Sequence, residues 1–251
     1  MLSSERKEVL LSRLRLDGRI VATEMASELQ VSDDSIRRDL RELAAAGLCQ
    51  RVYGGALPVA PAAADFAARE SIAVDSKKRV ATKALELIQP GMTVFLDGGT
   101  TALLVAQRLP RERALTVITH SPVVAMALLD APAVEVDLIG GRMFRHSAVT
   151  SGAAAAEQLA RVSVDLFLLG VTGVHPQHGL TTGDSGDAAM KRMIAGRAAE
   201  TWVLASREKI GAASPFAVVT FDDVAGIITD APSDDPAVSG LADSGTIVLM
   251  A

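Results

Sequence analysis

The sequence has little cysteine, few aromatic residues and no long apolar run. Cys49 is the only cysteine among 251 residues, so an internal disulfide is excluded and a reducing compartment, the cytoplasm, is the expected location. Aromatic residues make up 3% of the chain, so alanine and aliphatic side chains must fill the core. No stretch approaches the ~18 consecutive apolar residues that a membrane span requires. The charged start MLSSERKEVL lacks the apolar centre of a secretory signal, so no membrane partner is expected.

An excess of positive charge is also missing. The formal net charge is −5, and residues 1–57 carry nine basic and nine acidic side chains, so this segment is neutral. A DNA-binding module is usually basic. Any prediction of DNA binding must therefore come from the local arrangement of side chains rather than from bulk charge.

Residues 1–57 show the pattern of three helices followed by a hairpin. Apolar spacing predicts helices over 4–16 and 22–29. Ser32 is a suitable N-cap for a third helix that ends near Ala46, before Gly47. Residues 48–53 read as a strand, Gly54-Gly55 as a turn and residues 56–57 as the start of a return strand. This order predicts a winged helix-turn-helix domain.

The third helix has one apolar face and one arginine-bearing face. Ile36 and Leu40 share the face expected to pack inward, whereas Arg38 and Arg41 point the opposite way. Such a helix fits the major groove of double-stranded DNA. The candidate DNA-contacting residues lie on this helix or the hairpin and are Ser32, Asp34, Ser35, Arg37, Arg38, Arg41, Arg51 and Tyr53. A helical bundle with a solvated charged face is the alternative, although the order of elements favours DNA.

After a linker at 58–65, PVAPAAAD, the chain alternates between helices and strands. A long helix is expected at 66–88. The expected strands are 93–96, 115–119, 134–139 and 164–171, the expected helices are 100–108, 122–129, 153–162 and 188–199, and further short apolar runs lie at 201–205, 218–221, 226–229 and 246–249. This alternation predicts an α/β fold over residues 66–251, with a mainly parallel Rossmann-like sheet covered by helices on both faces.

A candidate ligand site follows the first of these strands. Residues Asp97, Gly98, Gly99, Thr100 and Thr101 lead from the strand into a helix. Two glycines allow close backbone approach, and the free N–H groups of the helix N-terminus can hold a phosphate. The spacing matches neither a dinucleotide fingerprint nor a Walker loop. A plain glycine-rich turn with Thr100 as N-cap remains an equally good interpretation of these residues alone.

Polar and glycine residues also follow other predicted strands, and such strand ends converge in an open parallel sheet. The additional candidate effector-binding residues are His120, Ser121, Gly141, Arg142, Gly173, Asp184, Lys191 and Lys209. Arg142, Lys191 and Lys209 could neutralise a phosphate, while Asp97 and Asp184 could accept hydrogen bonds from sugar hydroxyls. His175 and His178 provide only two ligands on an expected loop, so no metal or other cofactor is predicted.

The stretch VSDDSIRRDLREL, followed by AGLCQRVYGGA, resembles the N-terminal signature of the DeoR family of bacterial transcriptional regulators. The segments LDGGTT, TVITHS, LIGGR, DLFLLGVTG, GLTT and IITD resemble that family's sensor domain. The resemblance implies a winged helix-turn-helix joined to a domain similar in fold to sugar-phosphate isomerases and acyl-CoA transferases. It also implies that residues 97–101 lie in an effector pocket and that Lys191 and Lys209 add positive charge there.

The sequence departs from the family pattern at three positions in the predicted sensor domain. His120 stands where the family usually has asparagine, Asp187 where it often has glutamate, and Ser206 where it commonly has aspartate. These departures point to a change in the effector and leave the DNA-binding segment unaffected.

Together these observations predict a sequence-specific DNA-binding regulator, a repressor of carbohydrate metabolism genes controlled by a phosphorylated sugar or related metabolite. Its expected partners are operator DNA, the effector and further copies of the chain in a dimer or tetramer. The alternatives are a phosphosugar isomerase-like enzyme and a DNA-binding protein without an effector. An enzyme has no use for the N-terminal module, so no enzymatic activity is expected.

Overall fold

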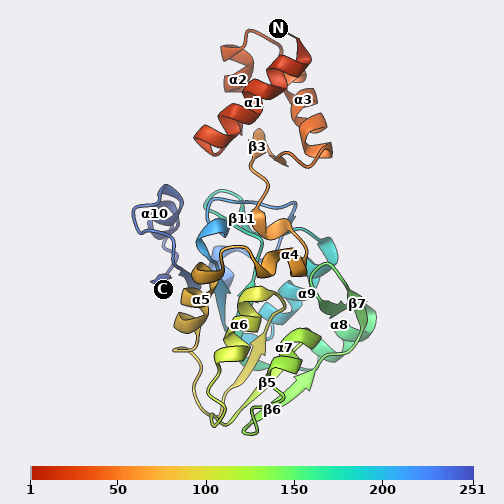
Figure 1. Cartoon of the computed structure of the whole chain (residues 1–251), viewed down its shortest axis with the longest axis vertical. Helices are drawn as coiled ribbons and strands as arrows, with labels where there is room; N and C mark the ends of the chain where they lie inside the picture. The colour runs from red at the N-terminus through yellow and green to blue at the C-terminus, as the bar shows by residue number, and fades with distance from the viewer. Residues whose placement is uncertain (1) are drawn as a thin grey trace.

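The computed structural model describes residues 2–251, apart from the side chain of Arg15, and shows two parts joined by one connecting segment (Figure 1). The smaller N-terminal part contains three helices and a three-stranded antiparallel sheet. Its elements are α1 (Ser3–Asp17), β1 (Ile20–Val21), α2 (Ala22–Glu28), α3 (Asp33–Ala45), β2 (Gln50–Val52) and β3 (Gly55–Leu57). This is the predicted winged helix-turn-helix arrangement, with β2 and β3 as the wing.

The apolar face of α3 is buried as its periodicity predicts. Ile36, Leu40 and Leu43 pack with Leu10 of α1 and Met25 of α2 in one cluster. The helix begins where the sequence indicated, because the hydroxyl of Ser32 accepts a hydrogen bond from the backbone N–H of Ser35 at 3.3 Å.

Two features of the N-terminal part were not expected from the sequence. Strand β1 pairs with β3, and this pairing requires Gly55, since a Cβ there would lie 1.7 Å from the carbonyl oxygen of Ile20. Asp39, on the buried side of α3, accepts a hydrogen bond from the hydroxyl of Ser3 and forms an ion pair with Arg6. A buried carboxylate is therefore satisfied by α1, and it ties α1 to α3.

The larger part is built on a seven-stranded sheet in which every neighbouring pair is parallel. The strand order is β15-β14-β12-β9-β4-β5-β6. The strands are β4 (Thr93–Leu96), β5 (Leu115–Thr119), β6 (Val134–Leu138), β9 (Val164–Gly170), β12 (Ala198–Leu204), β14 (Gly226–Thr229) and β15 (Val248–Met250). The chain builds outward from β4 to β6, then returns to the centre at β9 and builds outward in the other direction. The β4–β9 boundary is therefore a topological switch point.

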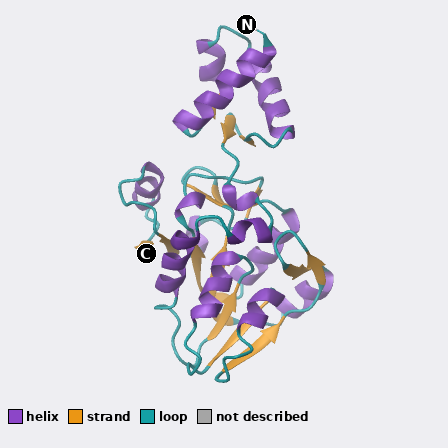
Figure 2. Ribbon diagram, in the orientation of Figure 1, coloured by secondary structure: helices purple, strands orange, loops and turns teal. Residues whose placement is uncertain are grey.

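Helices cover both faces of this sheet (Figure 2). Successive residues of each strand point to opposite faces, so Val94 and Leu96 of β4 join one core cluster while Phe95 joins the other. The first cluster includes α5 (Val74–Ala84), α6 (Thr100–Arg108) and α7 (Pro122–Ala127), and the second includes α8 (Ala153–Leu159), α9 (Ser185–Ala195) and α10 (Pro236–Asp243). None of the described helices is both long and apolar enough to cross a membrane.

Beyond the seven-stranded sheet and the sheet of the N-terminal part, the described residues form two small sheets and three 3-10 helices. They are the hairpin β7 (Arg142–Phe144) and β8 (Val149–Ser151), the sheet of β10 (Gly173–His175), β11 (Gly179–Thr182) and β13 (Phe216–Ala217), and the 3-10 helices η1 (Pro61–Ala63), η2 (Arg207–Lys209) and η3 (Phe221–Asp223). None of the hairpin strands was expected, and the run 218–221 that suggested a strand instead leads into η3. Helix α10 was also not expected.

Two helix predictions were wrong in extent. The expected helix over 66–88 is two helices, α4 (Phe66–Glu70) and α5, because the backbone breaks at Ala73, which adopts a left-handed conformation with φ +49°. The expected helix over 188–199 starts earlier, at Ser185, and ends at Ala195, since residues from Ala198 onward pair with β9. Sheet pairing outweighed the helix propensity of this alanine-rich stretch.

Candidate functional site

A pocket lies at the carboxyl ends of β4 and β9, at the topological switch point. Its walls combine residues of the loop after β4, the loop after β9, α9, η2, the β7–β8 hairpin and the segment around η1. The lining residues are Ala62, Arg69, Ile72, Lys77, Gly98, Gly99, Thr100, Thr101, Ala102, Ser147, Val149, Gly170, Val171, Thr172, Thr182, Asp187, Lys191, Leu204, Glu208 and Lys209. Ligands of open α/β sheets bind at this position.

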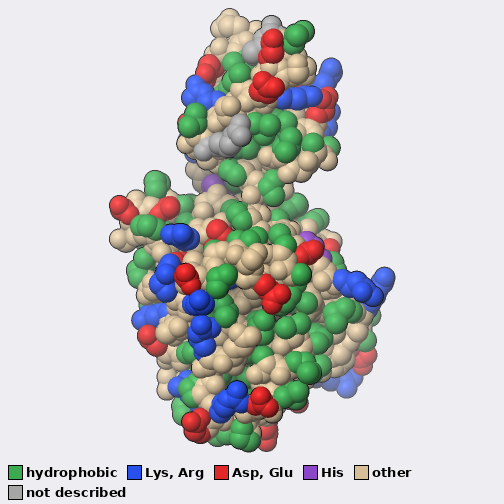
Figure 3. Space-filling view, viewed as in Figure 1, with side chains coloured by type: hydrophobic (Ala, Val, Ile, Leu, Met, Phe, Trp, Pro, Cys, Tyr) green, Lys and Arg blue, Asp and Glu red, His purple; other side chains and the backbone are tan. Residues whose placement is uncertain are grey.

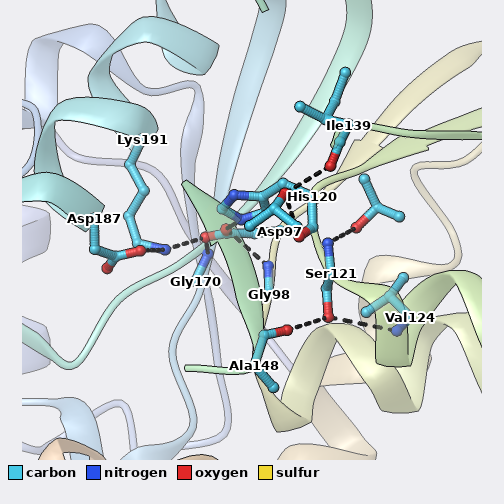
Figure 4. Close-up of polar contacts among 12 residues, drawn as sticks. Asp97, Gly98, His120, Ser121, Val124, Ile139, Ala148, Gly170, Asp187 and Lys191 are labelled. Carbon is cyan, nitrogen blue, oxygen red and sulfur yellow. Dashed lines mark hydrogen bonds and ion pairs between the residues drawn. The ribbon is translucent and has the colours of Figure 1, made fainter. Parts of the chain in front are cut away.

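Asp97 lies just before the pocket-lining residues of the loop after β4 and is completely buried. Figure 4 shows its polar contacts. One carboxylate oxygen accepts hydrogen bonds from the N–H of Gly98 at 2.8 Å and from Nε2 of His120 at 2.9 Å. The other accepts hydrogen bonds from the N–H of Gly170 at 2.8 Å and from Nζ of Lys191 at 2.6 Å. Four donors fill the acceptor capacity of the carboxylate.

Lys191 links Asp97 to the neighbouring carboxylate of Asp187. Its Nζ lies 3.2 Å from Oδ1 of Asp187, whose other oxygen accepts a hydrogen bond from the hydroxyl of Thr182 at 2.6 Å. Burial alone would disfavour the charges of Asp97 and Lys191, yet the attraction of Lys191 lowers the pKa of Asp97, and the two aspartates raise the pKa of Lys191. Asp97 and Lys191 therefore form a charged pair at neutral pH.

The loop after β4 requires glycine at positions 98 and 99. A Cβ at position 98 would lie 2.0 Å from Cγ1 of Val149, and Gly99 has φ +112°, so neither position accepts a larger residue without displacement. This loop leads directly into α6, whose first two residues, Thr100 and Thr101, are buried against the pocket. The N-terminus of α6 thus faces the cavity with its backbone donors.

Several polar atoms that line the pocket are buried without a hydrogen-bond partner among residues 2–251. They are Nη2 of Arg69, Oγ1 of Thr101 and Oε2 of Glu208, together with Oδ1 of Asp187, whose one polar contact is the ion pair with Lys191. Buried polar atoms in folded proteins are nearly always satisfied, so a group of unsatisfied atoms around one cavity needs an explanation. This set offers donors and acceptors to the same enclosed space.

Four cationic side chains surround the pocket, and two of them were not predicted from the sequence. Lys191 and Lys209 were expected, whereas Arg69 and Lys77 come from α4 and α5. Burial lowers the pKa of Arg69 and of Lys77, and it lowers the pKa of Lys209 to about 8. No sequence motif marked Arg69 or Lys77, because both lie in the stretch that read as one continuous surface helix.

The other predicted effector residues divide between supporting positions and more distant ones. His120 is buried behind Asp97 and does not line the pocket, and Ser121 caps α7 and donates to the carbonyl of Ala148 at 3.1 Å. Asp184 caps α9 and lines an adjoining cavity. The structure does not bring Gly141, Arg142 or Gly173 to the pocket lining. Gly141 precedes β7, and Arg142 is the first residue of that strand and is exposed. Gly173, in β10, pairs with Thr181 of β11.

The three departures from the family pattern all lie close to this site. His120 orients Asp97, Asp187 pairs with Lys191, and the buried hydroxyl of Ser206 donates to Glu208 at 2.6 Å. Ser206 therefore holds one oxygen of Glu208 and leaves the other facing the pocket.

The candidate DNA interface is the exposed face of α3 and the wing. Arg38, Arg41, Arg51 and Tyr53 are exposed, whereas Arg37 is engaged by Asp33 at 2.8 Å. The face also includes Asp34, while Ser32 and Ser35 are occupied in capping the helix. Basic and acidic side chains are interspersed over the N-terminal part on the face in Figure 3, in agreement with its neutral count.

No set of three or more His, Cys, Asp or Glu side chains is arranged to hold a metal ion within the described chain. The rings of His175 and His178 lie 4.5 Å apart, between centroids, and are tilted by 43° at the β10–β11 turn.

Comparison with known proteins assigns both parts of the chain. The family model described as "DeoR-like helix-turn-helix domain" matches residues 6–61. The model described as "DeoR C terminal sensor domain" matches residues 72–231. The chain belongs to the DeoR family. As a family member with both parts, it is a DNA-binding transcriptional regulator with a sensor domain.

Curated relatives of this DeoR-family chain match it over nearly its whole length. The HTH-type transcriptional regulator GlpR of Haloferax volcanii is 31% identical over 252 residues, which cover 99% of this chain and 98% of the relative. The HTH-type transcriptional repressor GlcR of Bacillus subtilis is 31% identical, with 92% of this chain and 89% of the relative covered. The glycerol-3-phosphate regulon repressor of Escherichia coli is 27% identical, with 97% of each covered.

Solved structures also match part of the chain. Ribose 5-phosphate isomerase A of Methanocaldococcus jannaschii matches with a TM-score of 0.41 and 22% identity, covering 54% of each chain. The eIF2B beta subunit of Chaetomium thermophilum matches with a TM-score of 0.45 and 17% identity, covering 61% of this chain and 48% of that one.

Proposed function

We propose that this DeoR-family regulator is a repressor of carbohydrate metabolism genes whose affinity for operator DNA is controlled by a phosphorylated sugar or closely related metabolite. In this proposal residues 1–57 bind DNA, residues 58–65 connect the two parts, and residues 66–251 bind the effector and mediate self-association. The effector occupies the pocket at the carboxyl ends of β4 and β9.

The observation that carries the proposal is the set of unsatisfied polar atoms around that pocket. Nη2 of Arg69 is a donor, Oε2 of Glu208 is an acceptor, and the Thr101 hydroxyl can act as either. A ligand that satisfies all three needs an anionic group and hydroxyl groups. The N-terminus of α6 beside Thr101 adds backbone N–H donors for a phosphate.

The charges around the pocket favour an anion. Four cations, Arg69, Lys77, Lys191 and Lys209, stand against three carboxylates, Asp97, Asp187 and Glu208. Asp97 and Asp187 both pair with Lys191, which leaves Arg69, Lys77 and Lys209 without a carboxylate in an ion pair. The formal charge of the whole set is therefore one unit positive, which favours a phosphate group.

The names of two relatives agree with a repressor, and one of them also names a phosphorylated metabolite. GlcR of Bacillus subtilis is named as a repressor, as is the glycerol-3-phosphate regulon repressor of Escherichia coli, whose name includes a phosphorylated three-carbon polyol. These two names support the proposal that this chain is a repressor.

An enzymatic role is less well supported by the chain as a whole. A general base for sugar isomerisation needs a carboxylate with a free oxygen near the substrate, and at this pocket Oε2 of Glu208 is such an oxygen, whereas both oxygens of Asp97 are occupied by four donors. The helix-turn-helix domain at residues 6–61, for which a metabolic enzyme has no use, favours the regulator. We propose that Asp97 and Lys191 position the pocket loops and catalyse no reaction.

We also propose that the chain acts as a homo-oligomer. One α3 helix reads only a single half-site, and two linked heads gain affinity by binding paired half-sites. Light scattering of the protein alone and with duplexes that carry one or two half-sites tests this. A monomer on a single half-site with undiminished affinity would contradict it.

Thermal unfolding with a panel of ligands tests the effector. The panel consists of inorganic phosphate, glycerol 3-phosphate, ribose 5-phosphate, fructose 1-phosphate and glucose 6-phosphate, each organic compound beside its unphosphorylated form. A ligand at about 100 times its Kd adds about 2.7 kcal/mol of stability, which raises the midpoint visibly. A rise only with phosphorylated compounds supports the proposal. A DNA-binding protein without an effector would show no rise with any of them.

A further inference from the structure

The segment that joins the two parts of the chain also forms one wall of the pocket. Ala62 of η1 lines the cavity and is buried, and Val59 forms a parallel bridge with Ala213. Helix η1 packs against η2, which carries Glu208 and Lys209. The connection at 58–65 is therefore seated on the sensor domain, and a ligand in the pocket lies beside it.

Arg69 stands at the exit of this connection and reaches back into the pocket. Its Nε donates to the carbonyl of Asp65 at 3.4 Å, and Asp65 is both the last residue of the connection and the N-cap of α4. A Cβ on Gly99 would lie 3.7 Å from Nη1 of Arg69, so the guanidinium sits directly over the glycine loop. Nη2 is buried and has no partner among the described residues.

The backbone around Arg69 is anchored to other pocket elements. Nζ of Lys77 donates to the carbonyl of Arg69 at 2.5 Å. The N–H of Phe66, at the start of α4, donates to the carbonyl of His146 at 2.8 Å, and the next residue of that hairpin, Ser147, lines the pocket. A movement of Arg69 is thus shared with the connecting segment and with the hairpin.

The guanidinium is held in a position that costs free energy without a ligand. Burial lowers the pKa of Arg69, while Asp187 and Asp97 partly offset this. An arginine side chain stays charged in proteins, so it cannot relieve the burial by losing its proton. A planar fork with one unpaired buried donor suits two-point contact with a phosphate.

We propose that Arg69 binds the anionic group of the effector and that this contact transmits occupancy of the pocket to the connecting segment at 58–65. The inference rests on the proposed function and adds to it the residue that couples the two parts. The anion attracts the fork toward the α6 N-terminus, and the contact between Nε and the Asp65 carbonyl carries this displacement into the connection. The response follows if the effector binds more tightly to one arrangement of this segment than to the other.

This coupling role separates Arg69 from the other anion contacts. Thr101 faces the same cavity from α6, which belongs to the core of the sensor domain. Loss of its hydroxyl weakens binding without breaking any link to the connection. Removal of the Arg69 fork affects both binding and response.

The test measures deuterium uptake by peptides that cover residues 58–66 in the full-length protein, with the panel compound that most raises the wild-type melting midpoint. Wild type should change its uptake on saturation. Thr101→Val should bind about tenfold more weakly yet show the full change at saturation. Arg69→Gln should bind about 100-fold more weakly and show no change at equal occupancy. The control Arg161→Ala removes an exposed arginine of the surface and should match wild type.

The outcomes distinguish the two levels of the proposal. If no panel compound, inorganic phosphate included, stabilises wild type, the proposed function fails and this inference fails with it. If wild type responds and Arg69→Gln shows wild-type affinity, or shows the full change in uptake at equal occupancy, only the role of Arg69 is overturned. Arg69→Lys keeps the charge without the fork. If Arg69→Gln binds too weakly to be saturated, Arg69→Lys tests the coupling in its place. A full change in deuterium uptake in Arg69→Lys contradicts the inference.

Discussion

Asp97 and Lys191 are 94 positions apart in the sequence, and their side chains meet at 2.6 Å at the centre of the sheet edge. Asp97 follows β4 and Lys191 projects from α9, so the ion pair closes the switch point between the two halves of the sheet. Both groups are buried, which leaves neither with water as an alternative partner.

Asp97→Asn should destabilise the protein strongly. The change removes the charge that balances Lys191 and leaves that ammonium with Asp187 alone, so we expect a loss of about 3–5 kcal/mol. Urea unfolding measures the difference. Asp130→Asn, at an exposed position, is the matched control and should change stability by less than about 0.5 kcal/mol. Equal stabilities of the two variants would show that the buried pair adds nothing.

The same pair predicts an acid dependence of stability. The pKa of Asp97 is lower in the folded than in the unfolded protein, so its contribution is present above the unfolded value of about 4 and is lost as pH falls below it. The slope of unfolding free energy between about pH 4 and pH 2 should therefore be shallower in Asp97→Asn than in wild type. Parallel slopes would contradict the assignment of the acid-sensitive group.

Binding of an anionic effector should weaken above about pH 8. Burial lowers the pKa of Lys209 to about 8, so this side chain loses its charge as pH rises through that value, and with it the attraction for phosphate. Titration calorimetry from pH 7 to pH 9.5 should show affinity falling by up to about tenfold per pH unit. Lys209→Met should bind more weakly at pH 7 and vary little with pH. If Lys77→Met removes the dependence instead, Lys77 is the titrating group.

Arg38 should contribute directly to operator affinity. It is exposed on α3 with no ion pair within the described chain, so its guanidinium is available to a guanine or a phosphate. Arg38→Ala should lower affinity by about 10- to 100-fold for a duplex selected from a random pool with the wild-type protein. Arg13→Ala, which removes an arginine paired with Glu28 and Asp17, serves as control at matched salt. Equal losses of operator affinity in Arg38→Ala and Arg13→Ala would show that Arg38 does not contact the operator.

A substitution at Ala73 should stabilise the protein. Ala73 has φ +49°, a left-handed conformation that costs an L-residue with a Cβ about 1–2 kcal/mol. Ala73→Gly removes this cost but adds about 0.5–1 kcal/mol of unfolded-state entropy, so we expect a net gain of about 0.5–1 kcal/mol. Ala68→Gly, within α4, should instead destabilise by a similar amount. A loss of stability in both variants would show that the conformation at Ala73 carries no strain.

The parts predicted well from the sequence are those whose pattern is local. Strand β4 and helix α6 match their expected bounds because an apolar run, a glycine pair and a helical repeat follow one another without interruption. The Ser32 cap and the buried face of α3 follow from the same local rules. The short strands β1, β7 and β8 escaped prediction, because runs of two or three residues carry no periodicity and exist only through pairing with distant partners.

The candidate site was predicted in part for the same reason. Residues 97–101 form one contiguous motif at a strand end; Gly98, Gly99, Thr100 and Thr101 line the pocket, and Asp97 is buried beside them. Arg69 and Lys77 lie in a stretch without such a motif, and the break at Ala73 that orients them is not visible in the residue pattern. Arg142 was predicted to join Lys191 and Lys209 at the pocket because it follows a strand, but it lies in the β7–β8 hairpin, where it is exposed to solvent.

By itself the sequence determined the order of most helices and strands and the separation of a neutral helical head from an α/β body, because these depend on composition and short-range periodicity. The family was indicated by contiguous motifs that resemble those of its other members, which are also a property of the sequence alone. Only the tertiary structure decided which charges share one cavity, which of them are already paired, and that the connecting segment forms a wall of that cavity. Those properties depend on distances between residues far apart in the chain, and such distances are set by how the sheet and its helices pack.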